Sequence, residues 1–526
     1  MKRLDLVLVS ESDDMAQGFA PAAMEAYLRC RPYLEYFTSA GSRLRLPDPG
    51  PMPVPQQLGL AALGTWVRRA GFSVSVHDSV FRDPGAVAEF LASLDRDPRI
   101  VGISTPLLVD AASVLRLVEQ VRERRPRALL VLGGFSAERR PEFRELADAT
   151  VIGPGEKPLV ELLACLKAGA DWRRLDNLCY FEGGREVRTP ARLDLHPDEV
   201  PPPDWELLSI RPSLCYPVQA SKGCRYACAF CGCVGPGRQR MRSIPLVVAE
   251  IERNFERYGV RFFRFIDTNL TSWPEHAERL CLALAAKGLP VEWGCFARID
   301  DLARRPSLSE TLRRAGCRWV FAGMESGSDA ILHSMGKGYT RQAILQGVRI
   351  ARSAGLRVHG NFIIGFPGET RATVDETLEV VSQSAPDLAA FFLLSIDEGT
   401  DAAIARHRER YGLRGRWDRW SHATMDSSEA LREIIRCMDA VTHGPGETAI
   451  GNENHWCYHL RGFGLSEDES LNYFRSFRLF HRAERSADAD AAQSALADIR
   501  RLILKIHDFW RTAYGRTQTG DSSRTP

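Results

Sequence analysis

Short apolar runs alternate with amphipathic helical patterns over residues 1–165. The apolar runs are LDLVLVS, FSVSVHD, RIVGIST, ALLVLGG and TVIG, and patterns such as LGLAALGTWVRRAG and ASVLRLVEQVRERR separate them. This alternation predicts a parallel sheet, because parallel strands need crossover helices on both faces. We therefore expect an α/β, doubly wound, Rossmann-like domain over residues 1–165.

Small and polar residues follow several of these predicted strands. Ligands of open parallel sheets bind beyond the carboxyl ends of the strands, where glycine lets a backbone approach closely. No G-x-G-x-x-G opens a helix after the first strand, so the pattern does not favour a dinucleotide. The candidate ligand residues at this edge are Ser104, Thr105, Gly133, Gly134, Gly153, Gly155 and Glu156, with the stretch around Leu58 and Gly59.

Residues 166–210 have a different pattern and predict a linker. The run NLCYFEGGREVRT is typical of a hairpin, and three consecutive prolines begin at Pro201. Consecutive prolines favour an extended chain, so a second domain is expected after them.

A longer strand and helix rhythm follows over residues 211–400. The predicted strands are YPVQAS, RFFRFID, VEWGCFA, RWVFAGM, RVHGNFIIG and AFFLLSI, with helical patterns such as PLVVAEIERNFERYG between them. Repeated β/α units predict a complete or partial TIM barrel, here a (β/α)6 unit, with its active site at the carboxyl ends of the strands.

Residues 401–526 have helical and aromatic patterns and predict a helical C-terminal cap. Trp420, His455, Trp456 and Tyr458 are candidates to touch a substrate, but core aromatics of a helical bundle explain them equally well.

Charge and hydropathy limit the classes of partner that we expect. The chain has 69 basic and 67 acidic side chains, so its net charge of +2 gives no reason to expect nucleic acid or an anionic membrane. The N-terminus lacks the apolar core and cleavage site of a secretory signal, and no run approaches the roughly 20 apolar residues of a membrane span. We expect a cytoplasmic protein that acts on a small molecule.

One cysteine group stands apart from the other cysteines. There are 13 cysteines, and most lie singly in apolar patterns, so a disulfide framework is not expected. In SKGCRYACAFCGC, Cys224, Cys228 and Cys231 have the spacing CxxxCxxC. A four-iron cube usually takes four thiolates, so three leave one iron open to an outside ligand. Zinc is the alternative, with Cys233 as a cramped fourth ligand, but no second C-x-x-C pair follows.

This cysteine motif, with Phe230 before the third cysteine, resembles the signature of the radical S-adenosylmethionine (SAM) superfamily. The resemblance implies a [4Fe-4S] cluster on the three cysteines that cleaves SAM reductively, with Phe230 near the SAM adenine. The segments AGMESGSD and GNFIIGFPGET are similar to later SAM-binding segments of the family. The resemblance assigns SAM contacts to Gly323, Glu325, Ser326, Asn361, Gly365 and Glu369, and the strand-end residues Asp267 and Arg298 are further candidates for the SAM carboxylate or a hydroxyl.

The domain order resembles the cobalamin-dependent branch of that superfamily. The matching pieces are LGLAALGTWVRRAGFSV, VGIST, VLGGFSA and VIGPGEKPLVELL. The D-x-H-x-x-G motif is absent, and the nearest histidine, His77, precedes Asp78. The resemblance therefore implies cobalamin bound without a histidine ligand to its lower face, although a degenerate domain that binds nothing is also open.

The resemblance implies methyl transfer to a carbon of a small-molecule substrate in specialised metabolism, with one SAM as methyl source and another as radical source. A flavodoxin- or ferredoxin-type protein is the implied one-electron reductant. Two alternatives remain. The same cofactors could serve a cyclisation, oxidation or rearrangement without net methylation, or the chain could be a non-catalytic iron-sulfur or cobalamin-binding protein.

Overall fold

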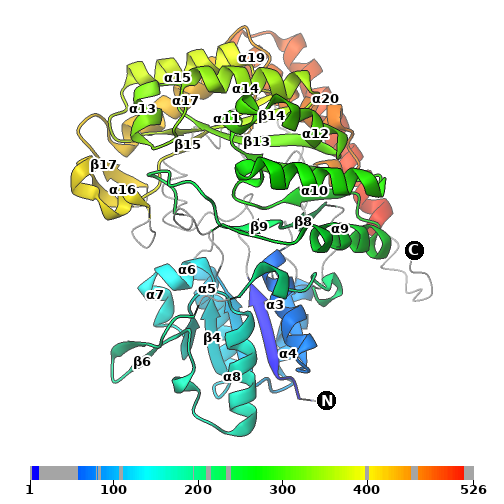
Figure 1. Ribbon diagram of the computed structural model, residues 1–526, viewed down its shortest axis with the longest axis vertical. Coiled ribbons are helices and arrows are strands. Elements are labelled where there is room, and N and C mark those ends of the chain that lie inside the picture. The colour runs from blue at the N-terminus through cyan, green and yellow to red at the C-terminus, as the bar shows by residue number, and fades with distance from the viewer. Residues whose placement is uncertain are drawn as a thin grey trace. The chain divides into compact units, whose positions relative to one another are not determined.

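The computed structural model describes residues 3–10, 57–78, 80, 84–105, 111–192, 195–208, 215–232, 239–396, 402–416, 418–451 and 460–514. They form two compact units, the first from the described residues up to 208 and the second from those after 214 (Figure 1).

A seven-stranded sheet, ordered β2-β1-β3-β4-β5-β6-β7, runs through the first unit. Strands β1 to β5 are parallel, and β6 and β7 continue the sheet as an antiparallel hairpin. The strands are β1 (Leu6–Ser10), β2 (Val74–Asp78), β3 (Ile100–Ser104), β4 (Leu129–Gly133), β5 (Ala149–Val151), β6 (Leu178–Glu182) and β7 (Arg185–Arg188). The order reverses between β1 and β3, and such a switch point is where ligands of open α/β sheets bind.

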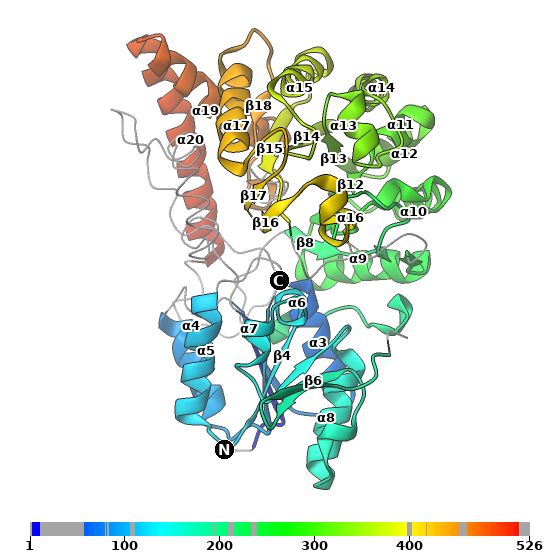
Figure 2. The same ribbon diagram turned by 90° about the vertical axis from the view of Figure 1, so that its left-hand side faces the viewer.

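Helices cover both faces of this sheet, which confirms the doubly wound fold. Figure 2 shows α3 and α8 on one side of the strands and α4 and α5 on the other. The helices are α3 (Leu58–Arg69), α4 (Pro84–Leu94), α5 (Ala111–Arg124), α6 (Phe135–Arg139), α7 (Pro141–Arg144) and α8 (Glu156–Ala168). The central strand β1 is buried along its whole length, which explains its unbroken apolar sequence.

The segment after the hairpin packs back onto the first unit. The backbone N–H of Asp204 donates to Thr65 Oγ1 at 2.8 Å, and Arg68 pairs with the Asp204 carboxylate. Trp205 beside it is buried. Residues 195–208 therefore belong to the compact body of this unit.

The second unit contains a parallel seven-stranded sheet, ordered β18-β15-β14-β13-β12-β11-β8. All six strands expected from the sequence are present, which confirms the partial barrel. The strands are β8 (Cys215–Val218), β11 (Phe262–Phe265), β12 (Glu292–Ala297), β13 (Cys317–Glu325), β14 (Arg357–Ile364), β15 (Leu388–Leu393) and β18 (Ala449–Ile450). No sequence pattern predicted β18, because two residues are too few to show a period.

Helices follow the strands of this sheet and fill the C-terminal region, as expected. Those between the strands are α9 (Ile244–Tyr258), α10 (Pro274–Lys287), α11 (Ile299–Arg304), α12 (Pro306–Arg314), α13 (Asp329–Ser334), α14 (Arg341–Ser353) and α15 (Arg371–Ser384). The C-terminal elements are α16 (Ala403–Arg406), β16 (Arg414–Arg416), β17 (Arg419–Ser421), α17 (Ser427–His443), α19 (Glu467–Arg485) and α20 (Ala489–Tyr514).

The two C-terminal helices share a core with the barrel. Trp319 and Phe321 of β13 pack in one apolar cluster with Leu471 of α19 and Leu502 of α20. The C-terminal region is thus part of the barrel's own core. Among the described residues, no helix combines the length and apolar character needed to cross a membrane.

Candidate functional site

The three motif cysteines lie in a loop whose base is clamped. Strands β9 (Ser221–Lys222) and β10 (Arg240–Met241) pair where the loop leaves and re-enters the barrel. Asp267, at the end of β11, accepts from Ala220 N at 3.0 Å and from Ser221 Oγ at 2.6 Å. Burial raises the pKa of Asp267 to about 6. The structure therefore places Asp267 beneath the loop, where its hydrogen bonds go to the chain itself.

The cysteines of the loop are half-buried, whereas most other described cysteines are buried. Burial raises the pKa of Cys224, and the nearby thiols of Cys228 and Cys231 add to the rise. In a cube each cysteine binds a separate iron, so the thiols need not converge on one point. Among the described residues, no three His, Cys, Asp or Glu side chains are placed to hold one metal ion. Cys233 lies outside the described residues.

Two buried cations flank Cys228. Arg298 Nη1 lies 3.9 Å from Cys228 Sγ, and the Lys337 ammonium lies 5.9 Å from the centre of the Phe230 ring. Burial raises the pKa of Cys228, while Lys337 and Arg298 oppose the rise. Opposite charge nearby favours the thiolate, which is the form that binds iron.

Arg298 is held by its own set of contacts. Its guanidinium lies 3.9 Å from the centre of the Tyr226 ring and pairs with Asp300 at 3.0 Å. Tyr226 OH donates to Asp301 Oδ1 at 3.1 Å. Because Arg298 is 6% exposed and already paired, it is fixed beside the cysteines and is no mobile surface charge.

Glu325 ends β13 in a strained conformation. Its φ is +67°, and the register of β13 against β14 shifts between Gly323 and Glu325. Lys337 Nζ donates to Gly323 O at 3.1 Å and to Glu325 Oε1 at 3.2 Å. Burial disfavours the ammonium, but Tyr339 and Glu325 outweigh it, so the pKa of Lys337 lies above its ordinary value. Such strain in a non-glycine residue is typical of functional sites.

Ser326, the next residue, contacts α15. It is fully buried, and its Oγ lies 3.4 Å from Thr377 Oγ1 on α15. Gly327 N also donates to Thr377 Oγ1, at 2.9 Å. The structure thus gives Ser326 a role in joining the end of β13 to α15.

The end of β14 supplies an unpaired acceptor and a buried turn. Asn361 is 8% exposed and pairs in register with Gly323, and its Oδ1 has no hydrogen-bond partner among the described residues. Glu369 is fully buried and accepts from Gly365 N at 2.5 Å. Burial raises the pKa of Glu369 to about 8, so this carboxyl keeps its proton near neutral pH.

Of the four aromatic candidates of the C-terminal region, the structure describes Trp420 alone. Trp420 is buried, donates to Leu394 O at 2.7 Å, and packs so closely on Gly365 that a Cβ there would lie 2.2 Å from its ring. Gly365 also has a φ of +98°, so both the backbone conformation and the close packing of Trp420 require glycine. His455, Trp456 and Tyr458 lie outside the described residues.

In the first unit, the predicted ligand residues gather at the carboxyl ends of β3, β4 and β5. Thr105 is fully buried, and its Oγ1 donates to Gly133 O at 2.9 Å and accepts from Ala137 N at 2.9 Å. Gly134 has a φ of +105°, and an added Cβ would lie 2.7 Å from Thr105 O. Gly153 also has a positive φ, and Glu156 begins α8 and is buried. Ser104 is half-buried at the end of β3.

His77 lies on β2 and contacts neighbouring side chains of the first unit. Its Nε2 lies 2.9 Å from Ser75 Oγ, and its ring meets that of Phe90 edge-on at 5.7 Å. Burial lowers the pKa of His77 to about 4. This histidine therefore has a structural explanation.

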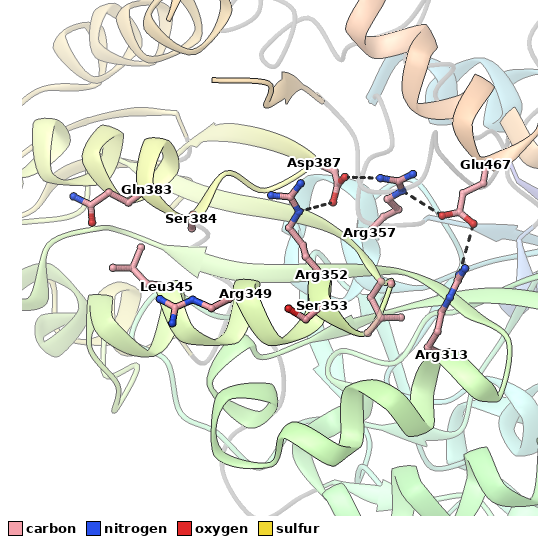
Figure 3. Close-up of a pocket in the computed structure, with 12 residues that line it drawn as sticks. Arg313, Leu345, Arg349, Arg352, Ser353, Arg357, Gln383, Ser384, Asp387 and Glu467 are labelled. Carbon is pink, nitrogen blue, oxygen red and sulfur yellow. Dashed lines mark hydrogen bonds and ion pairs between the residues drawn. The ribbon is translucent and has the colours of Figure 1, made fainter. Parts of the chain in front are cut away.

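A cavity of about 780 Å³ lies at the opposite, amino-end edge of the barrel (Figure 3). Arg357 bridges Asp387 at 3.1 Å and Glu467 at 3.2 Å, and Arg313 lies 3.7 Å from Glu467. These ion pairs connect the barrel to α19. Since barrel chemistry occurs at the carboxyl ends, we interpret this network as structural.

Sequence reasoning missed Lys337, Tyr339 and Tyr226. Lys337 stands in the loop GKG after α13, where a lysine looks like an ordinary solvated charge. Only the fold brings its ammonium to the end of β13, with Tyr339 OH donating to Gly323 O at 2.9 Å beside it. No spacing in the sequence signals this contact.

The residues present fit the expected cofactors. Thiols in one loop beside two cations suit an iron–sulfur cube with one open iron. The unpaired Asn361 Oδ1 offers an acceptor for SAM. In the first unit, Gly133 and Gly134 leave the end of β4 without large side chains, which suits a bulky ligand.

Two family models match the chain. The model of the radical SAM superfamily matches residues 218–381, and that of the B12 binding domain matches residues 54–163. The first covers the cysteine loop and strands β11 to β14 of the barrel, and the second covers β2 to β5 of the first unit. The chain's cofactors are therefore a [4Fe-4S] cluster, SAM and cobalamin.

Relatives and solved structures agree with these matches. An uncharacterized methyltransferase of Pyrococcus horikoshii is 31% identical over 359 residues, which are 65% of this chain and 76% of the relative. An anaerobic magnesium-protoporphyrin IX monomethyl ester cyclase of Cereibacter sphaeroides is 30% identical over 58% of this chain and 52% of its own length.

The fold resembles that of TsrM, a radical SAM methyltransferase from Kitasatospora setae, with a TM-score of 0.64 at 18% identity over 92% of this chain and 100% of that one. It also resembles OxsB, a cobalamin-dependent SAM radical enzyme, with a TM-score of 0.64 at 15% identity over 99% and 82% of the two chains. With its cysteine loop, barrel and preceding sheet, the chain belongs to the radical SAM superfamily, among the members that carry a B12-binding domain.

Proposed function

We propose that this enzyme transfers a methyl group from SAM to a carbon of a small-molecule substrate, using its cobalamin and its cluster. The observation that carries the proposal is the pairing of a cation-flanked cysteine loop with a B12-binding sheet in one chain. Relatives named as methyltransferases support it, including the Pyrococcus protein and a cytidylyl-2-hydroxyethylphosphonate methyltransferase of Streptomyces wedmorensis at 25% identity.

The chain's residues have distinct roles in this proposal. Cys224, Cys228 and Cys231 hold the cluster, and Arg298 and Lys337 offset its negative charge. The cluster supplies one-electron cleavage of SAM, and cobalamin supplies a methyl carrier, which is chemistry that side chains cannot provide. Phe230, Glu325, Asn361 and Gly365 orient SAM at the barrel mouth. The buried Trp420 packs on Gly365 and excludes water from that side of the barrel mouth.

A second candidate is cyclisation or another rearrangement without net methylation. It is favoured by the cyclase relatives, of which the Cereibacter protein is 30% identical over 322 residues. The two outcomes differ in mass, because methylation adds one CH₂ unit to the substrate.

The test uses full-length protein purified without oxygen. Iron, sulfide and cobalt are measured first, and the reduced protein is then incubated with methyl-deuterated SAM. Methyl transfer predicts both S-adenosylhomocysteine and 5′-deoxyadenosine, whereas a cyclase predicts 5′-deoxyadenosine alone. Protein that is fully loaded with cluster and cobalamin but forms neither product is a non-catalytic binding protein, and the proposal is then wrong.

A further inference from the structure

Arginine is concentrated in one segment beside the cysteine loop. Residues 406–419, here called the arginine segment, contain six arginines and only two acidic residues, although the whole chain has a net charge of +2. A strong local charge in a nearly neutral protein attracts an oppositely charged partner and speeds its association.

The strand pairing turns three of these arginines to one face. In the antiparallel pair β16 and β17, Arg416 lies opposite Arg419, and Gly415 lies opposite Trp420. Arg414, Arg416 and Arg419 therefore share a face, and all three are exposed. Trp420, on the other face, is buried against Gly365. Like charges directly opposite each other destabilise a strand pair, so stability does not explain this arrangement.

The arginine segment is fixed to the cysteine loop. Ile404 N, in α16, donates to Ala229 O at 2.8 Å, and Ala229 lies between Cys228 and Phe230 in the chain. At the other side, the rings of Tyr411 and Phe366 meet edge-on at 6.0 Å. A partner on the arginine segment is thus held next to the cluster ligands.

Several of these charges are not neutralised. Among the described residues, Arg406, Arg414 and Arg416 make no ion pair, and Arg406 is also exposed. A pocket of about 430 Å³ beside Arg225 offers a contrast. Its Arg304 lies 3.4 Å from Asp301, and its Arg305 lies 2.8 Å from Glu278, so carboxylates of the chain already offset these charges.

We propose that the arginine segment is the docking surface for a small acidic flavoprotein that carries one electron. Docking there brings the carrier to the loop that holds the cluster. The carrier is oxidised by one electron, and the cluster is reduced by the same electron. This inference rests on the proposed function, which consumes one electron for each SAM cleaved.

The experiment compares two reductants in stopped-flow under anaerobic conditions. The triple variant Arg406→Gln, Arg414→Gln, Arg416→Gln is mixed with hydroquinone flavodoxin or with reduced methyl viologen, and bleaching of the cluster absorbance is followed. With flavodoxin at low ionic strength, we expect the second-order rate to fall by about tenfold or more and to lose its salt dependence. With methyl viologen, which needs no docking surface, the rate stays at the wild-type value.

A matched triple variant, Arg482→Gln, Arg500→Gln, Arg501→Gln, removes the same charge from α19 and α20 and keeps the wild-type rate with flavodoxin. An unchanged flavodoxin rate in the first variant overturns the proposal. So does an equal fall with both reductants, which means that the cluster itself was damaged. If flavodoxin reduction is normal and only SAM turnover with methyl viologen falls, the arginine segment binds an anionic substrate instead. Absence of SAM-derived products with either reductant contradicts the proposed function, separately from docking.

Discussion

Predicted cofactor residues lie both at the barrel mouth and at the strand-end edge of the first unit. The chemical groups at the two places differ. The mouth is lined by buried ionisable side chains, with Arg298, Lys337, Glu325 and Glu369 close to the cysteine loop or the neighbouring strand ends. The first edge uses backbone and small residues, with Thr105 satisfied internally and Gly134 in a left-handed conformation. A charged cluster and a sulfonium need electrostatic stabilisation, whereas a large cofactor needs room. The two edges should therefore respond differently to mutation and to pH.

The largest expected effect is the loss of the cluster from the barrel mouth with no change in cobalamin at the first edge. Cys228→Ser removes one of the three thiolates, so we expect loss of cluster iron and of 5′-deoxyadenosine formation, while cobalt content stays at the wild-type level. Metal analysis and product chromatography of anaerobic protein measure this. Cys165→Ser, at a half-buried cysteine of the first unit, is the control. Loss of cobalt together with iron contradicts the independence of the two edges.

A change at Glu369 tests the pH response of the mouth. In the folded protein this carboxyl keeps its proton up to about pH 8, whereas in the unfolded chain it ionises near 4.5. The unfolded state alone releases the proton between these values, so the free energy of unfolding falls as pH rises through this window. Glu369→Gln removes that loss, which we expect to be about 3 to 4 kcal/mol between about pH 5 and 8. Urea unfolding followed by tryptophan fluorescence measures it, and identical pH slopes for both proteins refute the assignment.

The Lys337–Glu325 pair tests the cost of an unpaired buried charge. Lys337→Met leaves Glu325 without its ammonium partner and should lower the free energy of unfolding by about 3 kcal/mol. The midpoint potential of the cluster should also fall, because a nearby positive charge is lost. Potentiometric titration and urea unfolding measure these effects. The double variant Lys337→Met, Glu325→Gln should recover most of the stability, and a double variant as unstable as the single one argues against the pair.

Gly134 is the corresponding test for the first edge. Gly134→Ala forces a Cβ against Thr105 O at a φ of +105°, at a cost of about 1 to 2 kcal/mol. We expect about tenfold weaker cobalamin binding with unchanged cluster iron, as measured by equilibrium dialysis and metal analysis. Gly133→Ala, whose Cβ would lie 3.8 Å from Val151, should be tolerated in the fold. If Gly134→Ala binds cobalamin with wild-type affinity, this loop is not part of the cofactor site.

The smallest expected effect is at His77. Because this histidine is committed to Ser75 and Phe90, His77→Phe should leave cobalamin affinity unchanged. The electron paramagnetic resonance spectrum of the Co(II) form should show no nitrogen coupling in either protein. Nitrogen coupling that disappears in the variant identifies His77 as a cobalt ligand.

The sequence determined much of this protein, because its signals are local. Alternating apolar runs and helical patterns specified the parallel strands of both sheets, and all six expected barrel strands are present. The spacing of Cys224, Cys228 and Cys231 predicts a loop that binds the cluster, since one short loop must bring its own thiols together. Glycines such as Gly134 and Gly365 were also visible, because a positive φ leaves glycine as the favoured residue.

Tertiary structure decided which polar residues at the strand ends are hydrogen-bonded to the chain itself. Asp267, Ser326 and Thr105 looked like Asn361 in sequence, but their hydrogen bonds go to the chain itself, whereas Asn361 Oδ1 has no hydrogen-bond partner among the described residues. Lys337 looked like a surface charge and lies buried against Glu325. The reason is physical: the partner that satisfies a buried polar group comes from a distant element, and sequence periodicity reports only which face a residue occupies.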